Sequence, residues 1–321
     1  MVSVRAVTDL AECQATWCRA IGEETMTDLW AVRACFQRHF RRPPYFLVAE
    51  DAGEMCGLLP LSRIEEADGF GYFPGETWEG KTWLEQNRIV ARDPGVLEAL
   101  LGACPGNYHL RYLLPVGALP ADDHLVDERG YLFLPPRYDY DLDNYFQREF
   151  SGKAARKRRR ELAAIEDLGL TYRYDNLDDF EHLVSLNVNR FGERSYFFDA
   201  RFRESFRDLM HLLHAHGWLR MTTVVINGDV AAADMGCLYR GTYTLVAGGT
   251  HPDYRGVAKV INLHHMRRAC TERMQQVDFL CGEFSWKPLF RLIPRPLYVL
   301  TNVSHETPPT AACREETARV G

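Results

Sequence analysis

The sequence predicts an α/β (α+β) protein of two halves, in which mixed, mostly antiparallel sheets are flanked by helices. The chain has 321 residues, the length of two ordinary domains. Residues 1–145 hold 13 lysines and arginines against 23 aspartates and glutamates, whereas residues 146–321 hold 25 against 21. The second half also reads as two helices, a three-stranded meander and a strand–helix–strand unit. We therefore expect one domain over 1–145, a second over 146–304 and a disordered tail over 305–321.

The composition excludes several classes of protein. With 46% hydrophobic and 26% charged residues, the chain is not disordered, collagen-like or a coiled coil. No apolar run approaches the roughly 18 residues of a membrane span, and residues 1–9 lack the basic and apolar blocks of a secretory signal. The nine cysteines are scattered without a C-x-x-C pair, which argues against a disulfide framework or a zinc site and for reduced thiols in the cytoplasm. We expect no bound metal.

In the first half, short apolar runs between turn residues predict strands, and helical spacing of apolar residues predicts helices. The second of two early helices carries Leu29, Val32, Cys35, Phe36 and Phe40 on one face. The expected order is a strand at 2–7, two helices, strands at 45–50 and 55–61 joined by a turn at 51–54, a loop at 69–75, a helix at 96–104, a strand at 108–114 and an extended crossing at 135–142.

The second half gives clearer signals, because Asn227-Gly228 is a strong type I′ hairpin turn between two apolar runs. The expected order is a helix at 146–168, a strand at 170–174, helices at 180–191 and 200–215, strands at 219–226, 230–239 and 242–248, a helix at 258–274, a strand at 277–280, a helical turn at 286–292 and a strand at 297–303. A helix joins the strands that end near Gly248 and Leu280, so these strands should pair in parallel. Where such strands diverge at their carboxyl ends, a cleft opens beside a helix N-terminus and forms an anion site.

Three segments resemble a known family. They are the basic helix at 153–160, the hairpin at 226–231 and residues 278–287, which read DFLCGEFSWK. The last segment is similar to the pattern D-F-L-x-G-D/E-x-x-Y-K, with Trp286 in place of the tyrosine. Through these segments the chain resembles the GNAT acyltransferase superfamily, and most of all its CelD-like branch, which is associated with bacterial cellulose and exopolysaccharide loci and is related to FemAB-type transferases. The resemblance implies tandem GNAT-like halves, of which the first is degenerate and the second is the acyltransferase domain.

The resemblance also implies where acetyl-CoA or another acyl-CoA binds as a co-substrate, with no permanently bound cofactor. The superfamily's pyrophosphate loop has the pattern R/Q-x-x-G-x-G/A, and residues 254–260 correspond to it. Aligned on Arg255, its glycine positions hold Ala258 and Val260; aligned on Gly256 and Ala258, its leading basic residue becomes an aspartate. The residues expected to bind the donor are Gly248, Gly249, Arg255, Gly256, Val257, Ala258 and Lys259.

Acyl transfer from a thioester to an amine requires a general base, a hydrogen-bond donor at the developing oxyanion and a proton for the departing thiolate. Glu283 follows the carboxyl end of a strand and is the first candidate for the base. Asp234, in an otherwise apolar strand, is the second candidate, unless it only faces water. Tyr254 or Tyr243 can protonate the thiolate, although packing is the alternative role of each.

Other candidates carry two interpretations each. Gly248-Gly249 suits a pantetheine arm lying along exposed backbone N–H groups, or relieves crowding in a bent strand. Trp286 and Lys287 are candidates for substrate binding, and Lys287 can alternatively hold Glu283 in an ion pair.

We therefore expect a monomeric N-acyltransferase that moves an acyl group from acyl-CoA to an amine and binds no DNA. The acceptor class, an amino sugar or another envelope or exopolysaccharide precursor, is implied by the resemblance. Two alternatives stay open. In an aminoacyl-tRNA-dependent, FemAB-like transferase, the helix at 153–160 would bind the RNA backbone. In a catalytically inactive GNAT fold, which the altered loop at 255–260 favours, the chain would serve as a binding or scaffold protein.

Overall fold

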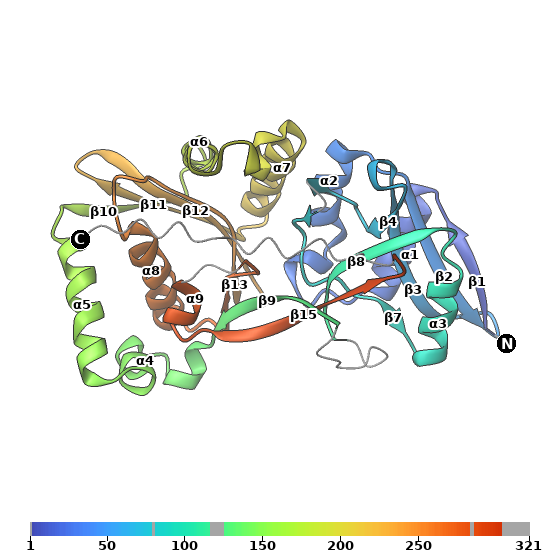
Figure 1. Ribbon diagram of the computed structural model, residues 1–321, viewed down its shortest axis with the longest axis horizontal. Coiled ribbons are helices and arrows are strands. Elements are labelled where there is room, and N and C mark those ends of the chain that lie inside the picture. The colour runs from blue at the N-terminus through green and yellow to red at the C-terminus, as the bar shows by residue number, and fades with distance from the viewer. Residues whose placement is uncertain (1, 79–80, 116–124, 283–285, 304–321) are drawn as a thin grey trace.

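The computed structural model describes residues 2–78, 81–115, 125–282 and 286–303, and Figure 1 shows how their helices and strands are arranged. The helices are α1 (Leu10–Ala20), α2 (Trp30–Phe40), α3 (Pro94–Gly102), α4 (Leu142–Glu149), α5 (Gly152–Glu166), α6 (Asp179–Phe191), α7 (Ala200–Ala215), α8 (Val257–Thr271) and α9 (Trp286–Leu289). The strands are β1 (Ser3–Val7), β2 (Pro44–Asp51), β3 (Glu54–Ile64), β4 (Gly69–Tyr72), β5 (Thr77–Trp78), β6 (Lys81–Thr82), β7 (Val90–Ala91), β8 (Asn107–Leu113), β9 (Val126–Phe133), β10 (Leu170–Tyr174), β11 (Leu219–Ile226), β12 (Asp229–Tyr239), β13 (Thr242–Thr250), β14 (Gln276–Asp278) and β15 (Ile293–Thr301).

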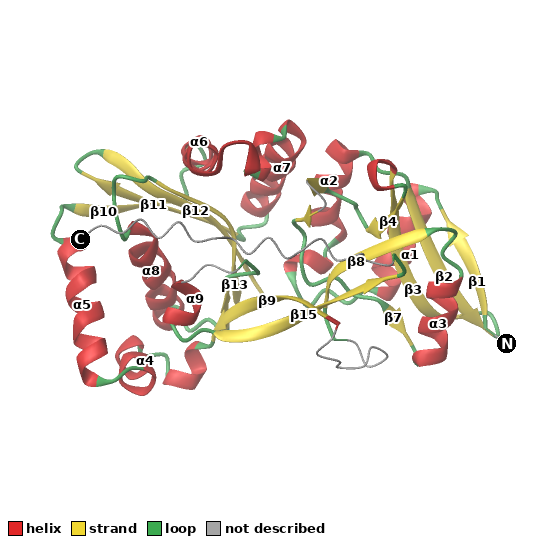
Figure 2. Cartoon of the chain, in the orientation of Figure 1, coloured by secondary structure: helices red, strands yellow, loops and turns green. Residues whose placement is uncertain are grey.

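One large sheet runs through both halves of the chain (Figure 2). Its order is β1-β2-β3-β4-β8-β15-β9-β14-β13-β12-β11-β10, with β7 beside β3. β4 pairs in parallel with β8, and β13 pairs in parallel with β14, whereas β1 to β4 and β10 to β13 are joined by antiparallel pairs. Each half therefore repeats one pattern of four antiparallel strands followed by a parallel neighbour. The protein is a mixed α/β fold with a mostly antiparallel sheet flanked by helices, as the sequence predicts.

The two halves exchange strands at the centre of this sheet. β9 comes from the first half of the sequence, yet it pairs with β14 and places Phe133 opposite Val277. β15 comes from the end of the chain, yet it pairs with β8, with Leu300 opposite Leu110, and also with β9. The domain boundary at residue 145 stays a prediction. β9, which precedes this boundary in the sequence, pairs with β14 of the second half, and β15, which follows it, pairs with β8 of the first half.

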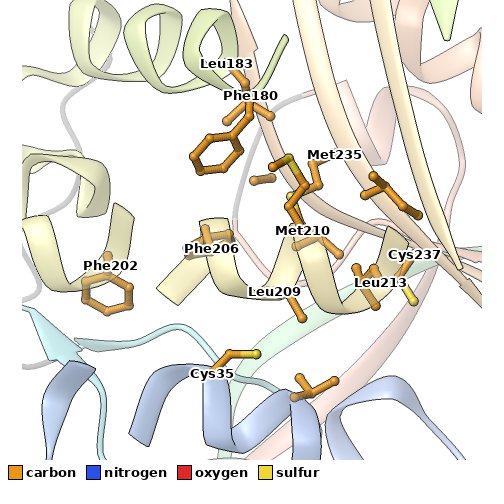
Figure 3. Close-up of a cluster of buried hydrophobic side chains, with 14 of the residues drawn as sticks. Cys35, Phe180, Leu183, Phe202, Phe206, Leu209, Met210, Leu213, Met235 and Cys237 are labelled. Atoms are coloured by element: carbon orange, nitrogen blue, oxygen red, sulfur yellow. The ribbon is translucent and has the colours of Figure 1, made fainter. Parts of the chain in front are cut away.

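A hydrophobic core packs α2 of the first half against α7 of the second (Figure 3). The ring centroids of Phe36 and Phe206 are 5.5 Å apart, and those of Phe40 and Phe202 are 4.8 Å apart, both in edge-on contact. The buried members labelled in the figure are Cys35, Phe180, Leu183, Phe202, Phe206, Leu209, Met210, Leu213, Met235 and Cys237. Because this core includes residues of α2, α6, α7 and β12, the two halves bury this part of their apolar surface together.

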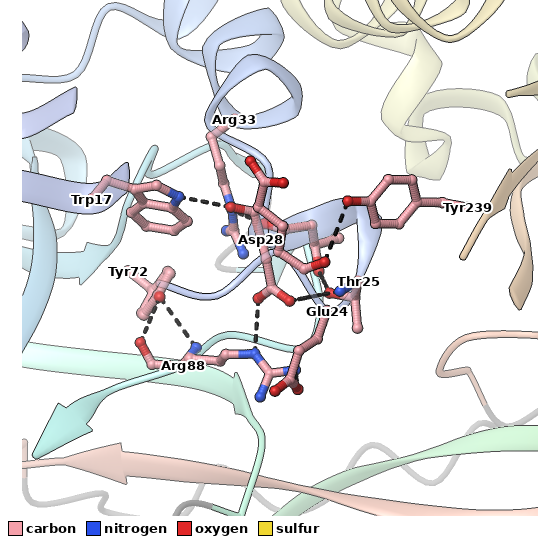
Figure 4. Close-up of polar contacts among 10 residues, drawn as sticks. Trp17, Glu24, Thr25, Asp28, Arg33, Tyr72, Arg88 and Tyr239 are labelled. Atoms are coloured by element: carbon pink, nitrogen blue, oxygen red, sulfur yellow. Dashed lines mark hydrogen bonds and ion pairs between the residues drawn. The ribbon is translucent and has the colours of Figure 1, made fainter. Parts of the chain in front are cut away.

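A polar network around Asp28 makes a second contact between the halves (Figure 4). The Asp28 carboxylate accepts hydrogen bonds from the backbone N–H of Thr25 at 2.7 Å and from Nε of Arg88 at 2.8 Å. Nearby, the hydroxyl of Tyr239 on β12 donates to the carbonyl oxygen of Glu23 at 3.3 Å. The segment between α1 and α2 is thus held by the ion pair between Asp28 and Arg88, and Glu23 connects it to the second half by a hydrogen bond.

Two expectations for the first half are wrong. The loop expected at 69–75 is partly a strand, β4, in which the glycine at position 69 allows the backbone of Asn107 to approach closely. A Cβ atom at Gly69 would lie 2.9 Å from the Asn107 carbonyl oxygen. The strand β9 is not expected at all, because its charged residues hide the alternation of buried and exposed positions.

The expected entry to the second half is also wrong. The extended crossing expected at 135–142 contains the 3-10 helix Pro135–Tyr138, since prolines suit the first positions of a helical turn. The single helix expected at 146–168 is two helices, because the hydroxyl of Ser151 accepts the backbone N–H of Ala154 and begins α5 there. The other expected elements agree within a few residues. The tail expected at 305–321 lies outside the described residues.

Candidate functional site

β13 and β14 run side by side only where they begin. Thr242 lies opposite Gln276, and Thr244 lies opposite Asp278, at which β14 ends. β13 continues to Thr250 without β14 beside it, which confirms the parallel pair and the divergence expected from the sequence. Functional groups of open sheets gather at the carboxyl ends of such strands. The site is therefore built around the end of β13, the start of α8 and the chain that follows β14.

The start of α8 presents positive charge and free N–H groups. Gly256 is the N-cap residue and has φ +86°, a left-handed conformation that glycine adopts without strain. Arg255 is exposed and Lys259 is half-buried, and neither forms an ion pair within the described part of the chain. The N–H groups of Gly256 and Ala258 likewise have no acceptor among the described residues. Free donors and the positive end of the helix dipole make this helix start suitable for an anion, while the side chain of Val257 is buried beneath it.

The two glycines at the end of β13 allow close packing. A Cβ atom at Gly249 would lie 2.8 Å from the carbonyl oxygen of Leu183 on α6, and one at Gly248 would overlap the Asp234 carboxylate. The carbonyl oxygen of Gly248 accepts a hydrogen bond from Nδ2 of Asn187 at 2.9 Å. The relief of crowding expected as one role of these glycines is thus visible, and their role toward a pantetheine arm stays a prediction.

Asp234 faces α8 from β12 and is not exposed to water. It is 4% exposed, and its Oδ2 lies 2.9 Å from Nε2 of His265. The hydroxyl of Tyr243 lies 3.5 Å from the same nitrogen. Burial raises the pKa of Asp234, and the hydrogen bond with His265 opposes that rise. Because His265 is more than two turns into α8, this pair lies roughly 12 Å along the helix axis from the start of that helix.

His265 is a residue that sequence reasoning missed, although a signal for it exists. A carboxylate in an apolar strand needs a buried partner. His265 stands among the inward-facing residues of the helix that follows, between Leu263 and Met266, which are both buried. A search for a polar residue on that face would have found it.

Tyr254 lies in a different place from Asp234. It lines a pocket of about 710 Å³ formed by α6, the turn between β11 and β12, and the loop before α8. Its hydroxyl donates to Oδ2 of Asp229 at 3.1 Å. Asp234 does not line this pocket, so the structure does not bring these two candidates for proton transfer together.

The ammonium group of Lys287 is buried and held by the backbone. Its Nζ donates to the carbonyl oxygens of Phe279, Leu280 and Cys281 at 3.0, 2.9 and 2.6 Å. The residue is 2% exposed, and burial lowers the pKa of its ammonium group to about 8. Lys287 therefore organises the chain after β14, and its role toward a substrate stays a prediction.

Trp286 and Glu283 belong to the same segment. The ring of Trp286 packs edge-on against Phe279 at 5.3 Å and against Phe290 at 5.8 Å between centroids. Glu283, the first candidate for the base, lies outside the described residues. Its role and its ion pair with Lys287 stay predictions.

Two buried residues of the first half reach this segment, and sequence reasoning missed both. Glu85 is 7% exposed, and its two carboxylate oxygens accept the backbone N–H of Cys281 at 2.8 and 3.0 Å. Nε2 of Gln86 donates to Oδ2 of Asp278 at 2.9 Å. Burial, together with the charge of Asp278, raises the pKa of Glu85 to about 7. No local pattern marks a contact between residues 196 positions apart.

A comparison with protein families places the match in the second half. Residues 151–288 match the family described as acetyltransferase (GNAT) domain. The match includes β10 to β14, α5 to α8 and most of α9, and therefore all the site residues of the second half. In this region the chain is similar to GNAT acetyltransferase domains. No curated protein matches the chain in sequence.

Solved structures share the fold over nearly the whole chain. A conserved protein of unknown function from Bacteroides thetaiotaomicron has a TM-score of 0.58 at 13% identity, covering 93% of this chain and 99% of its own. FemX has a TM-score of 0.56 at 9% identity, covering 93% and 97%. L-PGS from Bacillus licheniformis has a TM-score of 0.55 at 10% identity, covering 94% of each chain. At these identities the likeness concerns the fold alone. Within the described ranges, every helix is too short or too polar to cross a lipid bilayer.

Proposed function

We propose that this chain is an N-acyltransferase that moves an acyl group from acetyl-CoA or another acyl-CoA to an amine. One observation carries the proposal. Within the region that matches the GNAT family, α8 begins with free N–H groups beside Arg255 and Lys259, and it follows the end of β13, which runs on beyond its pairing with β14. Coenzyme A is a polyanion with an apolar amide arm, so it needs backbone donors, positive charge and an open strand edge in one place.

The donor would lie along the end of β13 and the start of α8. The N–H groups of Gly256 and Ala258 would face the pyrophosphate, and Arg255 and Lys259 would supply charge. The unpaired end of β13 would hold the amide arm. A side chain at Ala258, where the superfamily pattern has glycine, limits the approach of the backbone to phosphate, and the two basic residues offset this loss.

The reaction requires a base near the acceptor amine. The amine nitrogen attacks the thioester carbonyl, a base removes its proton, and the tetrahedral intermediate expels the coenzyme A thiolate, which takes up a proton. Asp234 is buried and already bonded to His265, so an acceptor could not reach it directly. We therefore rank Glu283, which follows β14 and Gly282, above Asp234 as the base.

The acceptor class rests on the resemblance of residues 278–287 to the CelD-like branch. We propose an amino sugar or a related envelope or exopolysaccharide precursor as the acceptor, and a monomer in the cytoplasm as the working form. These statements rest on the sequence motif and on the reduced, scattered cysteines.

A second candidate function is favoured by α5. Lys153, Arg156, Lys157 and Arg160 are spaced as one helix face, and all four are exposed. Such a stripe suits the phosphate backbone of an aminoacyl-tRNA, the donor of a FemAB-like transferase. Binding of RNA to this stripe would fall steeply with salt, because each neutralised phosphate releases counterions.

Calorimetric titration of the full chain with coenzyme A and acetyl-CoA tests the proposal. We expect both to bind, and we expect Arg255→Ala with Lys259→Ala to weaken the binding at least tenfold, since each charge-assisted contact contributes about 1.5–3 kcal/mol. Arg203→Ala, which removes an exposed arginine of α7, is the control and should leave the affinity unchanged. RNA binding without coenzyme A binding would favour the FemAB-like function. The absence of binding to any of these ligands would favour a scaffold.

A further inference from the structure

The chain that follows β14 is held from both halves of the protein. It turns sharply, because Leu280 and Gly282 both have positive φ angles, of 55° and 100°. A positive φ at leucine is uncommon and persists only when neighbouring groups hold it in place. The residues that hold Leu280 therefore determine the path of the chain toward Glu283.

On one side of this turn lies a cation of the second half. The carbonyl oxygens of Phe279, Leu280 and Cys281 all point to Nζ of Lys287. Because these three carbonyl groups point to the ammonium group, the N–H groups between them point away from it and need other acceptors. The N–H of Cys281 is one of these donors.

On the other side lies an anion of the first half. Glu85 accepts the N–H of Cys281 with both carboxylate oxygens, at 2.8 and 3.0 Å. The next residue, Gln86, donates to Asp278, which closes the same turn by accepting the N–H of Leu280 at 2.9 Å. The turn is thus fixed between a carboxylate at its N–H side and an ammonium group at its carbonyl side.

Packing alone does not explain this arrangement. Glu85 is 7% exposed and Lys287 is 2% exposed, and burying two charges costs more free energy than apolar residues of the same volume would. We therefore infer that Glu85 and Lys287 fix one conformation of the turn and add little to the free energy of unfolding. The conformation specified here is that of residues 278–282, directly before the candidate base.

We propose that Glu85 is a positioning residue, through which the first half of the chain completes the acyl-transfer site of the second half. It acts through the backbone N–H of Cys281 and touches no reacting atom. The expected effect of Glu85 on catalysis rests on the proposed function, whereas its effect on the conformation of residues 278–282 does not depend on that function. It also gives the first half a role that the match to residues 151–288 does not cover.

Two variants separate the reach of this side chain from its charge. Glu85→Asp keeps the charge but withdraws the carboxylate by one methylene group from the N–H of Cys281. Glu85→Gln keeps an oxygen acceptor at the same reach without the charge. Glu76→Asp is the matched control, because Glu76 is also a buried glutamate of the first half and accepts the N–H groups of Trp83 and Leu84, not of the turn.

Hydrogen exchange of the Cys281 amide is measured in the full chain for the parent and all three variants. We expect Glu85→Asp to accelerate this exchange on the order of tenfold, as loss of a charge-assisted hydrogen bond implies. Glu85→Gln should accelerate it less, because its amide oxygen still accepts the N–H without the charge, and Glu76→Asp should stay close to the parent. Unchanged exchange in Glu85→Asp, or equal acceleration in Glu76→Asp, would overturn the proposal.

The effect on catalysis is measured as thiol release from acetyl-CoA in the presence of glucosamine as the probe amine. We expect Glu85→Asp to lower kcat with little change in the affinity for acetyl-CoA, and Glu85→Gln to lower kcat less. A change in affinity alone would contradict a positioning role. If the parent neither binds acetyl-CoA nor releases thiol, the proposed function fails, and the exchange of the Cys281 amide still decides the role of Glu85 in the turn.

Discussion

Asp234 is a carboxylate that the fold keeps from water and bonds to a histidine. A buried carboxylate without a partner would cost several kcal/mol, so the hydrogen bond to His265 is a condition for the residue to occupy β12 at all. At 4% exposure, the carboxylate also has no direct access to an acceptor amine. This is the physical reason why we assign the stronger catalytic effect to Glu283.

Replacement of Glu283 by glutamine tests that assignment. We expect Glu283→Gln to lower kcat by about 10²–10⁴-fold, the usual contribution of a general base, with nearly unchanged affinity for acetyl-CoA. Stopped assays of thiol release and calorimetry measure the two quantities. If Glu283→Gln keeps full turnover while Asp234→Asn abolishes it, the base is Asp234 and our ranking is wrong.

Glu85 makes a prediction about stability and pH. Its pKa is raised to about 7 in the folded protein, whereas the unfolded value is about 4.3, so between these values the folded state binds more protons than the unfolded chain. The free energy of unfolding of the parent should therefore fall as pH rises through this window. Glu85→Gln has no proton to lose, and its stability relative to the parent should increase from about pH 4 to pH 7 in urea unfolding.

A variant at an exposed glutamate is measured beside it. Glu98→Gln, which replaces an exposed glutamate of α3, is the surface control in the same urea unfolding. A pH-independent stability difference between Glu85→Gln and the parent would contradict the raised pKa of Glu85.

At the level of single elements, α8 depends on the glycine that begins it. Gly256 has a left-handed conformation, and a Cβ atom there would lie 2.8 Å from Cδ1 of Ile165 on α5. Gly256→Ala should therefore cost about 1–2 kcal/mol in stability and weaken acetyl-CoA binding by shifting the helix start. Gly217→Ala is the matched control, since Gly217 also has a positive φ but open space around it. Equal affinities for acetyl-CoA in both variants would show that the helix start does not bind the donor.

The contact between α2 and α7 makes the second prediction for elements. Phe206 is fully buried between the halves, so Phe206→Ala should cost about 3–5 kcal/mol in the free energy of unfolding, measured with urea. Phe198 lies near the start of the same helix and is 57% exposed, and Phe198→Ala should cost less than about 0.5 kcal/mol. Similar costs for the two phenylalanines would contradict a shared core.

For the whole molecule, local patterns predict the elements but not the exchange between the halves. The hairpin at Asn227-Gly228 and the helix α8 follow from turn chemistry and apolar spacing. β9 and β15 pair across the boundary because their partners β14 and β8 offer unpaired edges, a property that depends on the completed sheet. The strand at 297–303 could be expected from its apolar residues, but nothing in the sequence of either strand identifies its partner in the opposite half.

Local sequence signals likewise predict one part of the candidate site and miss another. The basic, glycine-capped start of α8 could be predicted, because basic residues and glycine at a helix N-terminus are a local signal. The pairs Asp234–His265 and Glu85–Cys281 could not be read from spacing, since they join residues 31 and 196 positions apart. Where Glu85 is concerned, the contact also crosses from one half to the other.

Hydrogen exchange of the full chain with and without acetyl-CoA tests most directly that the donor binds between β13 and α8. We predict slower exchange of the amides at 245–250 and 254–259 when acetyl-CoA is bound, with smaller changes in the first half. Protection confined to α6 and the turn between β11 and β12, or to the first half, or no protection at saturating acetyl-CoA, would contradict the account.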